Sequence, residues 1–114
     1  KDEDGSNARS EAIRKATIGA ALAPLETIHA ALGLMNDLLQ LSRHCNANAL
    51  TDLAASAELA LSAAKIAQLN VMINTQYING DDVDLIDHDT EKAINECNEL
   101  DHVLRATYTE RLGW

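Results

Sequence analysis

The feature that most constrains the fold of this chain is a run of alanine and leucine between residues 53 and 71. It holds seven alanines, and its apolar residues occupy nearly the whole circumference of a helix. Alanine and leucine are strong helix formers, whereas strands favour aromatic and β-branched residues. Small side chains also let neighbouring backbones approach closely on several sides. The run therefore predicts an all-α, antiparallel bundle of about four helices, with this Ala-rich helix buried at the centre and the bundle dimerising.

The remaining helices are expected on either side of that segment. A first helix runs from a cap at Ser6 or Asn7 to Leu22, because Pro24 removes a backbone donor and interrupts the pattern. A second begins near Leu25, and its apolar residues alternate three and four positions apart, as in knobs-into-holes packing. These seam residues are Leu25, Ile28, Leu32, Met35 and Leu39.

The central helix is expected from a cap at Asn48 or Thr51 to about Thr75. A last helix, capped by Asp89 or Thr90, carries one apolar stripe. The stripe consists of Ile94, Cys97, Leu100, Leu104 and Tyr108. Residues 1–7 and 79–89 are expected to be loops, the second of them acidic, and residues 1–114 are expected to form a single helical domain.

Charge and cysteine usage restrict the function. Nine basic residues against 18 acidic ones give a formal net charge of -9, which would repel a phosphate backbone and argues against nucleic-acid binding. Polar residues interrupt the apolar runs, so no membrane span is expected. Cys45 and Cys97 form no CxxC pair, and no signal peptide is visible, so the predicted location is cytoplasmic. The histidines show no metal-binding spacing, and no metal is expected.

Polar residues on the Ala-rich helix are the candidates for a site. Asp52 and Asn70 lie 18 positions apart, which is five helical turns, so they share a face but are separated by about 27 Å. Asn46, Asn48 and Asp52 then form one cluster with Arg43, and Asn70 and Asn74 form another. In an antiparallel dimer, the start of one helix could meet the end of its partner's. Capping, dipole compensation and an amide network between helices are the structural alternatives.

Three motifs in register resemble a known family. They are Ala23-Pro24-Leu25-Glu26, the stretch from Asn46-Ala47-Asn48 through Thr51-Asp52 to Ala55, and Asn70-Val71-Met72-Ile73-Asn74. Their order and spacing resemble the formiminotetrahydrofolate cyclodeaminase and methenyltetrahydrofolate cyclohydrolase family over roughly residues 8 to 79. Cys45 replaces the family's usual glycine, and the family's N-terminal Pro-Gly-Gly-Gly-Ser stretch is absent from the sequence. The chain is therefore expected to be the C-terminal part of a cyclodeaminase-type domain.

The resemblance implies a helical homodimer in one-carbon folate metabolism that closes 5-formiminotetrahydrofolate to 5,10-methenyltetrahydrofolate and releases ammonia, or catalyses the related cyclohydrolase reaction. The tetrahydrofolate derivative would be the substrate, with no metal. Asp52 would be the catalytic proton shuttle, and Asn48, Asn70, Asn74 and Arg43 would bind the substrate. Arg14, Lys15 and Arg43 could receive the anionic glutamate tail.

Three other interpretations stay open. A companion chain could carry the N-terminal half and complete the enzyme. Alternatively, the chain is a non-catalytic helical interaction or ligand-binding module that retains the family scaffold, or a plain bundle whose asparagines are structural.

Overall fold

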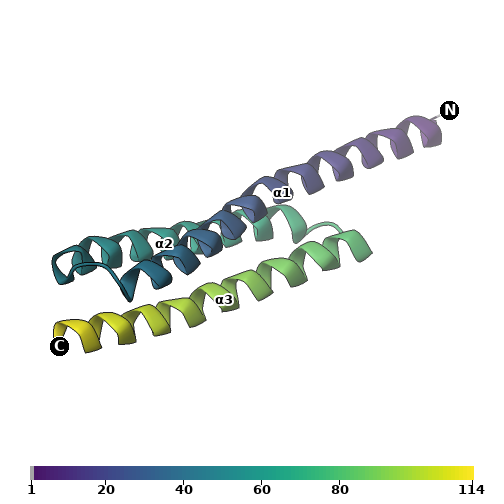
Figure 1. The fold of residues 1–114 in the computed structure, drawn as a ribbon. Coiled ribbons are helices and arrows are strands. Elements are labelled where there is room, and N and C mark those ends of the chain that lie inside the picture. Colours follow the sequence, from purple (N-terminus) through teal and green to yellow (C-terminus); the bar gives the residue numbers. More distant parts are fainter. Residues whose placement is uncertain (1) are drawn as a thin grey trace.

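A computed structural model describes residues 2–114, with side chains from Gly5 onward, and these residues are almost entirely helical. Three long helices run up and down, each antiparallel to the one before it (Figure 1): α1 (Asp2–Ser42), α2 (Leu50–Thr75) and α3 (Asp81–Leu112). A short 3-10 helix, η1 (Ala47–Ala49), precedes α2. The molecule is a rod of 71 × 18 × 17 Å in which α1 extends beyond the other two helices at the N-terminal end (Figure 1). The all-α class is confirmed, whereas the expected fourth helix is not present in the described part.

The expected break at Pro24 is wrong, because α1 is one helix of 41 residues that passes through it. A proline inside a helix removes a single backbone hydrogen bond, and packing on both sides can compensate. Ala21, Leu25 and Ile28 are buried on one continuous face across this position. The expected loop over residues 1–7 is also wrong where it is described, since Asp2 already belongs to α1; Lys1 lies outside the described residues.

The bounds of the Ala-rich helix agree with the sequence prediction, but its capping does not. α2 ends at Thr75 and begins at Leu50, directly after η1. Its N-cap residue is Ala49, which makes no side-chain cap bond, so neither Asn48 nor Thr51 serves as the expected cap. The amide of Ala49 instead donates to the Asn46 carbonyl at 2.9 Å. The backbone hydrogen bond of η1 therefore leads the chain into α2 without a side-chain cap.

The predicted central position of α2 is wrong. Only one face of α2 packs against α1 and α3, through small side chains every three or four residues. The buried residues include Leu53, Ala57, Ala60, Ala64, Ala67 and Val71. The opposite face is apolar as well but exposed, with Leu59 at 72 % and Leu69 at 64 %. A helix that is apolar all round needs partners on several sides, and this chain supplies them on one.

The acidic stretch after the second helix is helical rather than a loop, so α3 starts at Asp81 and not near Asp89. Two physical reasons explain the difference. Asp81, Asp82 and Asp84 lie in the first turn, where carboxylates offset the partial positive charge of a helix N-terminus. Val83 and Ile86 are buried, so the apolar stripe begins at Val83 rather than at Ile94.

The predicted seams of α1 and α3 are confirmed. Ile28 and Met35 of α1 and Leu104 of α3 are fully buried, and Leu32, Leu39 and Leu100 pack partly buried against them. Tyr108 is also buried, and its hydroxyl has no hydrogen-bond partner among the described residues. Burial raises the pKa of Tyr108 to about 12, with a smaller contribution from nearby acidic side chains.

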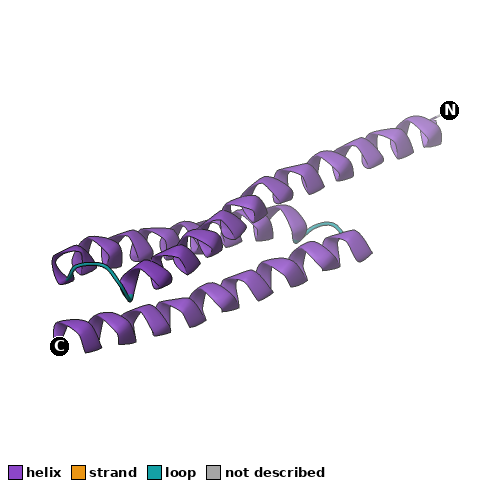
Figure 2. Cartoon of the chain, in the orientation of Figure 1, coloured by secondary structure: helices purple, strands orange, loops and turns teal. Residues whose placement is uncertain are grey.

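Arg14 joins α1 to the connection between α2 and α3. Its Nη2 donates to the Asn79 carbonyl at 2.9 Å and to Oδ1 of Asp82 at 2.5 Å. The guanidinium lowers the pKa of the Asp82 carboxyl. Gly80 lies between these partners with φ of 134°, and a Cβ there would be 2.5 Å from Arg14 Nη2. The Arg14 clamp therefore holds a turn that only glycine fits. Figure 2 shows this connection and the one between α1 and α2 as loops at opposite ends of α2.

By length and composition alone, one helix could cross a membrane. Within α1, the stretch Gly5–Ser42 contains a window with mean hydropathy of 1.4, of which 28 % is buried. The absence of a membrane span stays a prediction, although alanine and glycine make this stretch long and apolar enough by composition. A single helix of this kind is weak evidence for a span, since core helices of soluble proteins pass the same test.

Candidate functional site

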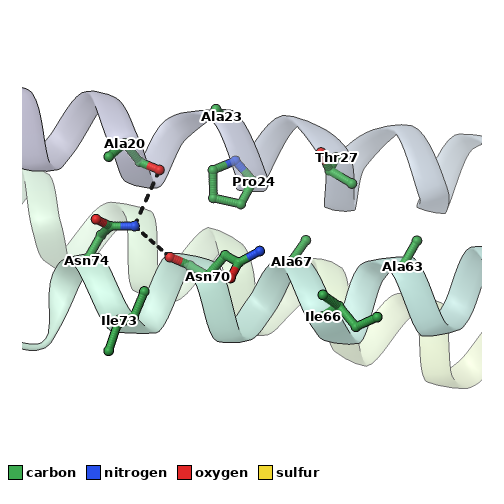
Figure 3. A pocket seen from close by; sticks show the side chains of 10 residues that line it. All are labelled: Ala20, Ala23, Pro24, Thr27, Ala63, Ile66, Ala67, Asn70, Ile73 and Asn74. Carbon is green, nitrogen blue, oxygen red and sulfur yellow. Dashed lines mark hydrogen bonds between the residues drawn. The ribbon is translucent and has the colours of Figure 1, made fainter.

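An open groove of about 680 Å³ lies between the middle of α1 and the C-terminal half of α2. Its walls are mostly small and apolar, and its polar groups are Thr27 from α1 and Asn70 and Asn74 from α2 (Figure 3). The remaining lining residues are Ala20, Ala23, Pro24, Ala63, Ile66, Ala67 and Ile73. The volume falls in the usual range for small-molecule sites.

Pro24 determines part of the hydrogen bonding in the groove. Proline has no amide hydrogen, so the carbonyl of Ala20, four residues earlier, loses its normal helical donor. The side-chain amide of Asn74 faces that carbonyl at 3.5 Å and donates to the Asn70 carbonyl at 2.7 Å. Figure 3 shows Asn74 reaching across the groove between the two helices. Pro24 and Asn74 are therefore linked through one backbone oxygen.

Asn70 is the more available of the two amides. Its side chain is exposed at the groove, and no hydrogen bond of that side chain to another described residue is present. An amide offers one acceptor oxygen and two donor hydrogens, which can match the alternating donors and acceptors at the edge of a heterocycle. The alanines beside it leave room for a flat ring. The groove is thus suited to a planar, polar-edged ligand.

The predicted site residues lie in two separate places, as their spacing along the sequence requires. Asn70 and Asn74 come together in the groove, whereas Arg43, Asn48 and Asp52 lie at the opposite end of the rod, around the connection between α1 and α2. These three side chains are exposed, and no hydrogen bond or ion pair joins them in the described part. One chain therefore does not place Asp52 beside the two asparagines.

The basic residues considered for an anionic tail are also separated. Arg14 is engaged with Asp82 and the Asn79 carbonyl. Lys15 is exposed on α1 and precedes the groove residue Ala20 by about 8 Å along the helix. Arg43 follows Pro24 by 19 positions, or roughly 28 Å, which places it far from the groove. Of the three, Lys15 alone is both close to the groove and unpaired among the described residues.

The contribution of α1 to the groove was not predicted from the sequence. Thr27 is its polar residue there, and Ala20 and Ala23 form the rest of that wall. A signal was present, because Ala23 and Pro24 belong to a motif already singled out and Thr27 lies one turn later. No three His, Cys, Asp or Glu side chains gather as a metal site would require within the described residues.

The fold and groove define a class: an elongated, all-helical domain with an open groove between two long antiparallel helices. The sequence profile described as Formiminotransferase-cyclodeaminase matches residues 1–96. The chain belongs to this family, which confirms the resemblance seen in the motifs and connects the chain to one-carbon folate metabolism. No curated protein and no solved structure matches the chain significantly.

Proposed function

We propose that the chain acts on a reduced folate and closes 5-formiminotetrahydrofolate to 5,10-methenyltetrahydrofolate, with release of ammonia. The observation that carries the proposal is the groove in a chain of this family, in which Asn70 and Asn74 converge beside a surface of alanines. The flat pterin would lie against the alanines, and the two amides would hold its polar edge. The related cyclohydrolase reaction would use the same binding surface.

The chemistry requires positioning and one proton transfer. N10 of the folate attacks the carbon of the protonated formimino group, and a new C–N bond forms. The proton of N10 is then transferred to the former formimino nitrogen, whose bond to that carbon breaks as ammonia leaves. Holding N10 and the formimino carbon at attacking distance converts this into an efficient intramolecular step. A carboxyl group such as that of Asp52 could shuttle the proton, in keeping with general acid catalysis. Within one chain, Asp52 lies too far from the groove for that role.

A direct test is to incubate the purified chain with 5-formiminotetrahydrofolate and follow methenyl product by near-ultraviolet absorbance and ammonia by a coupled assay. Asn70→Ala and Asn74→Ala should each weaken reduced-folate binding at least tenfold. The matched control is Asn36→Ala, because Asn36 makes the same type of bond to the carbonyl four residues earlier, at 3.2 Å, outside the groove. Equal binding by all three variants would refute the assignment of the groove.

A second function, a non-catalytic helical interaction module, is favoured by the exposed apolar face of α2 and by the distance of Asp52 from the groove. It predicts neither turnover nor saturable folate binding. We further propose that the protein works in the cytoplasm, because Cys45 and Cys97 are both free, and that it works as a homodimer.

A further inference from the structure

The wall of the groove that belongs to α1 exposes a backbone oxygen. In an uninterrupted α-helix the carbonyl of Ala20 would accept the amide hydrogen of residue 24, and Pro24 has none. The side-chain nitrogen of Asn74 faces this oxygen at 3.5 Å, which is long for an N–H···O bond, and donates to the Asn70 carbonyl at 2.7 Å. A carbonyl oxygen has two lone pairs. The Ala20 oxygen therefore keeps acceptor capacity on the side of the groove (Figure 3).

The same wall exposes a free hydroxyl. Thr27 lines the groove, and its hydroxyl makes no hydrogen bond within the described part of the chain. Four other helical threonines donate to the carbonyl four residues earlier, at 2.7 to 2.9 Å. These are Thr17, Thr90, Thr107 and Thr109. The hydroxyl of Thr27 is instead available to a ligand, both as a donor and as an acceptor.

Asn70 lies opposite these two groups and between them. The contact between Ala20 and Asn74 sets the register of the antiparallel helices α1 and α2. Asn70, one turn before Asn74, is then level with Pro24, as Figure 3 shows. Ala20 and Thr27 are seven positions apart, or about 10 Å along the axis of α1. The groove therefore presents an acceptor at one end, an amide in the middle and a hydroxyl at the other end.

We propose that the Ala20 carbonyl accepts a hydrogen bond from the exocyclic amino group of a 2-amino-4-oxopyrimidine ring, the ring that folates contain, and that this contact selects ligands by their amino group. The Asn70 amide holds the neighbouring edge of the ring, and the Thr27 hydroxyl contacts the substituent at N5. The identity of the ligand rests on the proposed function, whereas the selection for an amino group rests on the free acceptor.

The acceptors of the groove suit an uncharged amino group. No carboxylate lines the groove among the residues that the structure describes, so a charged ammonium group would lose water without gaining an opposite charge. An oxo group at the same ring position would place oxygen against oxygen and leave the Ala20 carbonyl without a donor. Sites that hydrogen-bond an N–H group reject analogues without it far more strongly than apolar sites reject a change of size.

The order of the polar groups also sets the direction of the ligand. With the amino group at Ala20, the substituted end of the ring lies toward Thr27, and this end carries N5 and N10 in a reduced folate. The separation of about 10 Å between Ala20 and Thr27 is comparable to the distance from the amino group to N10 in an extended molecule. Pro24 is a positioning residue in this arrangement, because it acts through the Ala20 carbonyl.

The selection is tested by calorimetric titration with 5-formyltetrahydrofolate and with the analogue in which an oxo group replaces the 2-amino group. The wild type should bind the amino compound about tenfold more tightly or better. Pro24→Ala should reduce this ratio to about threefold or less, because the new amide hydrogen occupies the Ala20 oxygen. Loss of the proline ring by itself would weaken both compounds equally and leave the ratio unchanged. A wild type without preference, or a Pro24→Ala variant that keeps it, would overturn the proposal.

The orientation is tested with Thr27→Val, which removes the hydroxyl and keeps the shape of the side chain. It should weaken binding of both compounds by the same factor, about fivefold, and keep the ratio between them, because the formyl group at N5 is common to both. The matched control is Thr107→Val, because the Thr107 hydroxyl donates to the Val103 carbonyl at 2.9 Å on α3, outside the groove. Equal binding by the two variants would overturn the orientation.

The titrations and the turnover assay separate this inference from the proposed function. Selective binding of the amino compound, without formation of methenyl product from 5-formiminotetrahydrofolate, would refute the proposed function and leave the selection by Ala20 intact. Turnover by a protein that does not distinguish the two compounds would overturn the selection alone. Binding of neither compound would overturn the inference.

Discussion

Replacing Pro24 by alanine should stabilise the protein and change the chemistry of the groove. Alanine restores the amide hydrogen that proline lacks, so residue 24 can donate to the Ala20 carbonyl. A proline inside a helix costs about 3 kcal/mol relative to alanine. Proline also restricts the unfolded chain, so its loss returns up to about 1 kcal/mol in the other direction. The net expected gain is about 2 kcal/mol, or roughly 8 °C in Tm.

The Pro24→Ala and Asn74→Ala substitutions should also be coupled in their effects on the free energy of unfolding. In the wild type, Asn74→Ala removes an amide that faces the Ala20 carbonyl at 3.5 Å; in a Pro24→Ala background that carbonyl already has a donor. The two substitutions should therefore be non-additive by about 0.5–1 kcal/mol. Urea denaturation followed by circular dichroism, at one fixed protein concentration, measures the free energy of unfolding of the wild type, the two single variants and the double variant. A destabilised Pro24→Ala protein, or strict additivity, would refute the account of the groove.

Three further results are expected. Gly80→Ala should lower stability by about 1 kcal/mol or more in denaturation experiments, because its φ of 134° disfavours a side chain and the new Cβ would meet Arg14; an unchanged midpoint would contradict this. Stability should decline as the pH rises from about 10 to about 12, because the buried phenol of Tyr108 keeps its proton longer in the folded state than in the unfolded one; the alkaline loss should disappear in Tyr108→Phe, and its persistence would refute the link. Ala64→Leu should cost about 1–3 kcal/mol, because Ala64 is fully buried between helices, whereas Ala63→Leu should keep the midpoint within about 0.5 kcal/mol and weaken folate binding by filling the groove; the opposite pattern would show that the two faces are misassigned.

Local pattern was enough to predict much of the helical structure. The seam through Ile28 and Met35 and the stripe through Leu104 follow from residue spacing, and burial confirms them. The break at Pro24 was not predictable in this way, because one lost hydrogen bond is outweighed by packing on both sides of it. The acidic segment after Gly80 was predicted to be a loop because of its many carboxylates, although Val83 within it lies on the buried face of α3.

The candidate site, like the fold, was only partly predictable from the sequence. Asn70 and Asn74 were found from the sequence because amides are unusual on an apolar helix, and the structure brings them together. The wall from α1 required knowledge of which helices are neighbours. The pattern of α2 predicts partners on both of its faces, whereas the structure shows partners on one. It could not tell whether those partners lie in the same chain.

The Arg14 clamp has a consequence for how the protein folds. Arg14 and its partners Asn79 and Asp82 are separated by 65 and 68 residues, so the clamp can form after α1, α2 and the start of α3 are in place. Contacts between residues so far apart in the sequence form late, because the long intervening segment must be brought together before they can be made. Loss of the guanidinium should therefore leave the folding rate nearly unchanged and accelerate unfolding. Arg14 thus governs how long the native rod persists rather than how quickly it is reached.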